Sequence, residues 1–105
     1  MVVGALKLTL HLPYSQGLKP KRKVVRAIAD RVRARFNTAV SEVGSQDLWQ
    51  RIELGMVVCG PEVGHVERQL EAIGRFVEQL MLAEIVDRRQ QVMNLKEMPW
   101  LPAGY

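Results

Sequence analysis

An alternating pattern near the start of the chain constrains the fold most strongly. From Val2 to Leu12 every second residue is apolar or glycine, and the residues between them include Lys7, Thr9 and His11. A period of two is typical of a β-strand that buries one face. The fold must therefore cover one face of this strand and leave the other partly polar.

Helical and strand-like patterns follow one another along the rest of the chain. Residues 19–36 and 63–80 repeat apolar residues at helical spacing, whereas 37–43 and 50–60 have the composition or alternation of strands. Residues 83–93 are extended and polar enough for an edge strand. This order predicts an α+β fold, the ferredoxin-like βαββαβ sandwich, with a four-stranded antiparallel sheet and two helices on one face.

One domain is expected over residues 1–95, followed by an irregular tail at 96–105. A length of 105 residues, with 48% hydrophobic and 25% charged residues, is typical of a single globular domain. The tail contains two prolines in PWLPAGY and no periodic pattern. Its Trp100, Leu101 and Tyr105 are candidates to contact a partner, to cover the domain's own surface, or to be disordered.

The positive charge of the chain is concentrated in one segment. Residues 19–35 hold eight Lys and Arg residues against Asp30 alone, a net charge of +7, and the remainder is net −3, which gives the total of +4. Asymmetry of this kind points to a binding surface more than the total charge does.

The basic residues of this segment are the leading candidates for phosphate binding. Positive charge near a helix N-terminus opposes the helix dipole, so it does not serve helix stability, but it suits an anion. Six contacts to duplex nucleic acid predict a salt slope of about −5. The alternatives are a solvated face that pairs with acids elsewhere, or an acidic protein partner. The six residues are Lys19, Lys21, Arg22, Lys23, Arg26 and Arg33.

The segment GSQDLWQR at 44–51 is the second candidate. Trp49 is suited to stack on a base or to anchor a partner, with Asp47 and Arg51 orienting the contact. In the alternative interpretation, Trp49 packs on the core and Asp47 pairs with Arg51.

The polar face of the sheet favours dimerisation or simple hydration over base stacking. RNA-recognition motifs share this topology but stack bases on aromatic residues of the first and third strands, and the corresponding stretches here, ALKLTL and ELGMVVCG, have none. The residues expected on this face are Lys7, Thr9, His11, Arg51, Glu53 and Val57.

No catalytic residue, metal site or cofactor is expected. His11, Cys59 and His65 fall on different predicted elements without the spacing of metal or nucleophilic motifs. A single cysteine fits a reducing compartment, and no apolar run approaches a membrane span, so the cytoplasm is the expected location.

Three segments resemble the YlxP-like family of small bacterial proteins. They are LKPKRKVV (18–25), RFNTAVSEV (35–43) and QDLWQRIELG (46–55), within a similarity that runs from about Val2 to Val92. The resemblance implies a ferredoxin-like fold. Genes of the family often lie beside translation and ribosome-maturation genes, which implies a role near the ribosome, and no catalytic residues are known for it.

Three classes of function follow from these observations. The first is a non-enzymatic accessory protein that binds RNA or a ribosomal particle through the basic helix. The second is a homo-oligomeric interaction module that joins copies through the sheet face or an edge strand. The third, ranked last, is a small enzyme, which requires a pocket with perturbed titratable groups.

Overall fold

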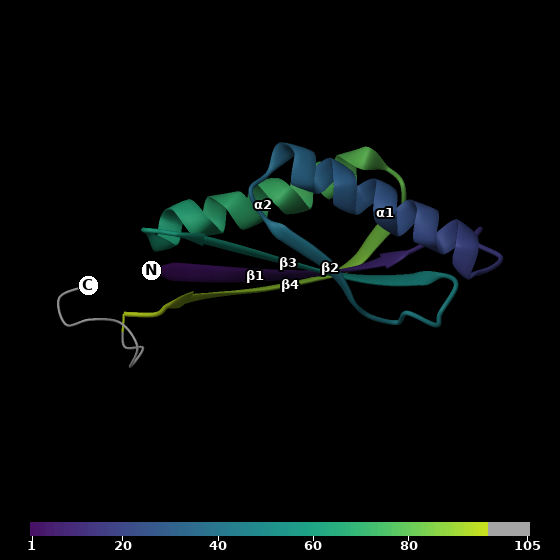
Figure 1. The fold of residues 1–105 in the computed structure, drawn as a ribbon, viewed down its shortest axis with the longest axis horizontal. Coiled ribbons are helices and arrows are strands. Elements are labelled where there is room, and N and C mark those ends of the chain that lie inside the picture. Colours follow the sequence, from purple (N-terminus) through teal and green to yellow (C-terminus); the bar gives the residue numbers. More distant parts are fainter. Residues whose placement is uncertain (97–105) are drawn as a thin grey trace.

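The computed structural model describes residues 1–96, which form six elements in the predicted order. The strands pair antiparallel in the order β2-β3-β1-β4, and both helices lie on one face of the sheet (Figure 1). The ferredoxin-like βαββαβ prediction is therefore confirmed. The elements are β1 (Val2–His11), α1 (Leu18–Arg35), β2 (Ala39–Gly44), β3 (Arg51–Gly60), α2 (Val63–Leu80) and β4 (Glu84–Asn94).

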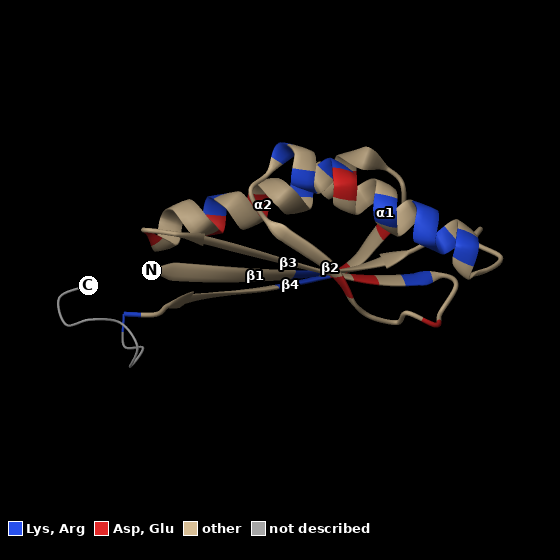
Figure 2. Cartoon of the chain, in the orientation of Figure 1, with Lys and Arg blue, Asp and Glu red and all other residues tan. Residues whose placement is uncertain are grey.

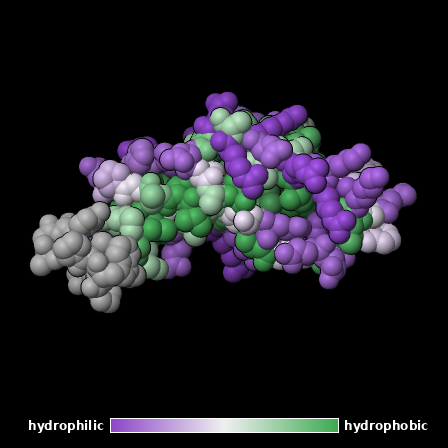
Figure 3. All heavy atoms as spheres, viewed as in Figure 1, coloured by the Kyte–Doolittle hydropathy of each residue, from purple (hydrophilic) through white to green (hydrophobic). Residues whose placement is uncertain are grey.

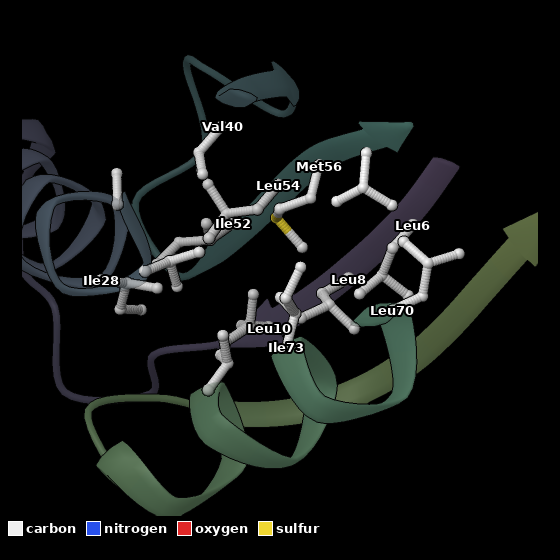
Figure 4. Close-up of a cluster of buried hydrophobic side chains, with 14 of the residues drawn as sticks. Leu6, Leu8, Leu10, Ile28, Val40, Ile52, Leu54, Met56, Leu70 and Ile73 are labelled. Atoms are coloured by element: carbon white, nitrogen blue, oxygen red, sulfur yellow. The ribbon is translucent and has the colours of Figure 1, made fainter. Parts of the chain in front are cut away.

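Strand β1 lies inside the sheet and accounts for the alternating pattern. It pairs with β3 along one side and with β4 along the other. Its alternate leucines point toward the helices and meet the alternate apolar residues of β3, which forms the centre of the core (Figure 4). The buried residues of the two strands include Leu6, Leu8, Leu10, Ile52, Leu54 and Met56.

Helix α2 lies close to β1 because position 4 has no side chain. A Cβ atom on Gly4 would lie 2.8 Å from Leu70 Cδ1, so a larger residue there would push the helix away. The predicted stripe of α2 is buried through Val66, Leu70 and Val77. Val63, expected to begin that stripe, is exposed instead, because the first turn of α2 lies at the end of the sheet (Figure 1).

The boundaries of two elements differ slightly from the sequence pattern. Strand β2 begins at Ala39 rather than at residue 37, because a turn precedes it in which the Thr38 N–H donates to the Phe36 carbonyl. Strand β4 lies at a sheet edge, as predicted. The predicted tail residues Trp100, Leu101 and Tyr105 lie outside the described residues. No helix within residues 1–96 is long and apolar enough to cross a membrane.

Candidate nucleic-acid interface

Helix α1 separates an apolar face from a basic face. Ile28, Ala29 and Val32 are buried against the sheet, and hydrophilic side chains cover the opposite side (Figure 3). The helix begins after Gly17 without a side-chain cap hydrogen bond, and no acidic residue lies in its first turn. Lys and Arg residues follow one another along the helix (Figure 2).

Four of the six predicted phosphate-binding residues form an exposed row on α1. Lys19, Arg22, Lys23 and Arg26 are exposed and recur at spacings of three and four, so they lie along one side of the helix. None of the four takes part in an ion pair with another of residues 1–96. We call these four residues the basic row.

The prediction that Lys21 contacts phosphate is wrong, because its side chain does not reach the surface. Its side chain is 1% exposed, and its Nζ lies 3.0 Å from Glu42 Oε2 and donates to the Ser45 carbonyl. Lys21 precedes Ile28 by seven residues and Val32 by eleven, so it shares the buried side of α1. That spacing is visible in the sequence and is the signal that identifies it. Lys21 therefore attaches α1 to β2 and cannot contact phosphate.

Arg33 is exposed, but its guanidinium already makes contacts within the chain. Its guanidinium donates to the Val40 carbonyl at 2.7 Å and lies 3.4 Å from Asp30 Oδ1. Strand β2 lies at a sheet edge, so Arg33 pairs a backbone group of an edge strand. Beside it, a shallow groove of about 270 Å³ between α1 and β2 is lined by Arg22 and Arg26 as well.

The loop residues do not take the alternative arrangement, in which Trp49 packs on the core and Asp47 pairs with Arg51. Trp49 is 54% exposed and does not pack into the core. Arg51 lies 3.9 Å from Glu53 rather than pairing with Asp47. The loop extends to the side of the sheet opposite the helices (Figure 1). Its backbone is fixed there by a hydrogen bond of 2.9 Å from the Leu12 N–H to the Gln50 carbonyl.

A cleft lies under this loop on the open face of the sheet. It has a volume of about 710 Å³ and is lined by residues from β1, β4 and the loop. Thr9 is only 3% exposed although it points away from the helices, because the loop covers it. Leu48 and Val86 could not be predicted as lining residues from the sequence, since their contribution depends on how far the loop folds over the sheet.

Glu53 is the electrostatic centre of the open face. Hydrogen bonds from Lys7, at 2.8 Å, and from the Ser45 hydroxyl hold the pKa of Glu53 at about 2, and these outweigh the opposing effect of burial. The positive charge of Arg51 acts in the same direction. Because Ser45 also accepts a hydrogen bond from Lys21, one chain of polar contacts connects α1 to the open face.

The residues considered for metal or nucleophilic chemistry are not brought together. His11 lines the cleft at the end of β1, Cys59 is exposed on β3, and His65 lies near Gly60 with its ring 3.4 Å from Gln69 Nε2. Among residues 1–96, no three His, Cys, Asp or Glu side chains form a cluster able to hold a metal ion.

These features define a ferredoxin-like α+β domain with a basic helix on one side of its sheet and a tryptophan-bearing loop on the other. The chain belongs to a family described as "protein of unknown function (DUF503)", whose model matches residues 3–90. The YlxP-like resemblance recognised in the sequence is confirmed by this match and by the relative that follows.

Two comparisons place the chain among known proteins. It is 36% identical over 61 residues to the uncharacterized protein YlxP of Bacillus subtilis (strain 168), a match that covers 58% of this chain and 66% of that protein. Its structure is similar to that of a REP-associated tyrosine transposase bound to a REP hairpin, with a TM-score of 0.42 and 10% identity. That similarity covers 88% of this chain and 56% of the other, and it is too distant to bear on function.

Proposed function

We propose that this protein is a non-enzymatic RNA-binding protein that contacts the phosphate backbone through the basic row on α1. The observation that carries the proposal is the lack of ion-pair partners, among residues 1–96, for Lys19, Arg22, Lys23 and Arg26, although acidic residues are plentiful elsewhere in the chain. Exposed, unpaired cations on one face of a helix neutralise phosphates and release counterions. The resemblance to a family linked to translation makes a ribosomal particle in the cytoplasm the natural RNA partner.

The N-terminal position of the basic row supports the same proposal. Lys19 lies in the first turn of α1, which begins at Leu18, where the helix dipole is positive and like charge is unfavourable. A cost of this kind is offset when an anion binds there. The buried Lys21–Glu42 pair fixes this end of the helix to β2, so the row is presented on a rigid support.

The experiment is binding of the purified protein to ribosomal subunits and to bulk RNA over a salt series. Four phosphate contacts predict a slope of log K against log salt of about −3.6 on duplex RNA and about −2.8 on single strands. The variant R22E/R26E should lose saturable binding. A matched control, R68E/R75E, makes the same charge change on exposed residues of α2 and should retain most of it. Equal binding by R22E/R26E and the parent would contradict the proposal.

A homo-oligomeric interaction module remains the second candidate, and the open face favours it. Val43, Val57 and Val86 are each about half exposed on that face or its margin, and exposed apolar residues gathered on one surface mark interfaces. Sedimentation at micromolar concentration tests this second candidate, which is compatible with RNA binding. A dimeric mass that V57E reduces to a monomer would support an interface on the sheet, whereas a monomeric parent would exclude it at that concentration.

A further inference from the structure

The cleft beneath the β2–β3 loop is lined by both apolar and polar side chains. Trp49 and Leu48 of the loop and Val86 of β4 line it and are each about half exposed. Thr9 lies deep within it, at 3% exposure. Around these, the cleft is completed by the polar residues His11, Asp47, Gln50 and Arg51.

We propose that this cleft binds one unstacked base of a single-stranded RNA, an inference that rests on the proposed RNA-binding function. A base has a flat apolar face and an edge that carries both donors and acceptors. The indole of Trp49 offers a stacking surface for the face. Asp47, which is exposed, accepts hydrogen bonds, and Arg51, also exposed, donates them, which matches the mixed edge of a base.

The cleft lies across the sheet from α1 but near the end of the molecule where the basic row begins, and this position favours a nucleic acid as its occupant. Lys21, at the N-terminal end of α1, donates to the Ser45 carbonyl at the start of the loop. Gln50, at the end of the loop, donates to the Pro13 carbonyl at 3.0 Å, in the connection that leads into α1. The start of α1 and the β2–β3 loop therefore lie at the same end of the molecule, on opposite sides of the sheet (Figure 1, Figure 2). One polyanionic strand that passes around this end can engage both the basic row and the cleft.

The conformation of the loop is also fixed by contacts within the domain. The Leu12 N–H, the Lys21 ammonium and the Gln50 side chain make three connections that fix the loop to the rest of the domain. Trp49 is consequently exposed on a loop that is tied at both ends. A large apolar side chain held in solvent by such contacts is the arrangement expected of a recognition residue rather than of a core residue.

The consequence is a preference for single strands, because a base in a duplex is stacked and cannot enter the cleft. Stacking on one aromatic side chain contributes about 5- to 150-fold in affinity. The basic row acts through phosphates and is indifferent to the presence of bases. The two contributions can therefore be measured separately.

The test compares a short oligouridylate with an abasic oligomer of the same length and backbone. Both are measured against the parent, W49A, W49F and R22E/R26E at low salt. Trp49 fluorescence is followed in a W100F background, where it is the only tryptophan. V57A, on the same sheet face but outside the cleft lining, is the control for a general effect of changing that face.

We expect W49A to bind oligouridylate about 5- to 150-fold more weakly than the parent and to bind the abasic oligomer like the parent. W49F, which keeps an aromatic ring, should bind oligouridylate more tightly than W49A. Oligouridylate, but not the abasic oligomer, should quench Trp49 fluorescence. If W49A binds both oligomers like the parent while R22E/R26E binds neither, the base site is overturned and the proposed function stands. If the parent binds neither oligomer nor duplex RNA at low salt, the proposed function itself fails.

Discussion

Gly74 lies in the middle of α2, where glycine weakens a helix by about 1 kcal/mol relative to alanine. The side chain of Arg88 on β4 explains why glycine occupies this position. A Cβ atom on Gly74 would lie 2.8 Å from the Arg88 Cζ, in space that the guanidinium occupies. From that position Arg88 donates at 3.1 Å to both Glu71 and Gln90, and more weakly to the Leu70 carbonyl.

We predict that G74A destabilises the protein by about 1 kcal/mol, against the propensity scale, because displacing Arg88 disrupts hydrogen bonds worth about 0.5–1.5 kcal/mol each. Urea denaturation measures the change. In an R88A background the obstruction is gone, and G74A should instead stabilise the helix by about 1 kcal/mol. A stabilising G74A in the parent would mean that Arg88 moves aside without loss.

Glu53 makes the stability of the domain sensitive to acid. Its pKa is lowered from 4.5 to about 2 by hydrogen bonds from Lys7 and Ser45. A carboxyl whose pKa is depressed in the folded state contributes stability that is fully present above the unfolded pKa. That contribution is lost as the pH falls from 4.5 toward 2.

We predict that E53Q loses stability at neutral pH and declines less steeply than the parent as the pH falls from 4.5 toward 2. The midpoint of urea unfolding, measured across that range, reports both effects. E67Q is the matched control, because Glu67 is exposed and makes no ion pair among the described residues. Parallel pH profiles for E53Q and the parent would show that Glu53 has no such role.

At the scale of elements, α1 carries two separate functions on two sides. Its buried side holds Lys21, whose pair with Glu42 attaches the helix to β2. Its exposed side presents the basic row. A buried pair is weak support for net stability, but removing one partner is costly because the other remains buried and charged. Charge on the first side is therefore structural, and charge on the second is free for a ligand.

We predict that K19E stabilises the protein and weakens RNA binding at the same time. A negative charge in the first turn of α1 interacts favourably with the helix dipole, by about 0.3–1 kcal/mol, while the row loses a phosphate contact. Thermal denaturation and RNA titration of the same samples measure the two effects.

R31E is the control, since Arg31 is exposed in the C-terminal half of α1 and a negative charge there gains nothing from the dipole. If K19E left both stability and binding unchanged, the charge at the helix start would have neither an energetic cost nor a binding role.

For the molecule as a whole, periodicity was enough to predict the fold. The alternation of β1 and the apolar stripes of both helices are strong local signals, and their order leaves few alternative topologies. Boundaries such as the start of β2 escaped prediction because they depend on turn contacts made by Thr38 with Phe36 and Val57.

The candidate site could be predicted only in part. The exposed basic row followed from composition and helical spacing. The burial of Lys21 is encoded in the same spacing, but lysine is so rarely buried unless paired that its positive charge predicts exposure. The cleft was beyond sequence analysis, because Thr9, Trp49 and Val86 come from three separate segments whose meeting depends on the path of one loop.

The burial of Lys21 also divides the lysines of this segment by chemical reactivity. Acetylating reagents modify amines that solvent can reach, and Lys19 and Lys23 are exposed whereas the Lys21 amine is enclosed by Glu42 and Ser45. Mild acetylation of the native protein therefore neutralises positions 19 and 23 and spares position 21. Modification of Lys21 in turn reports that the domain has opened, which makes this residue a covalent marker of unfolding.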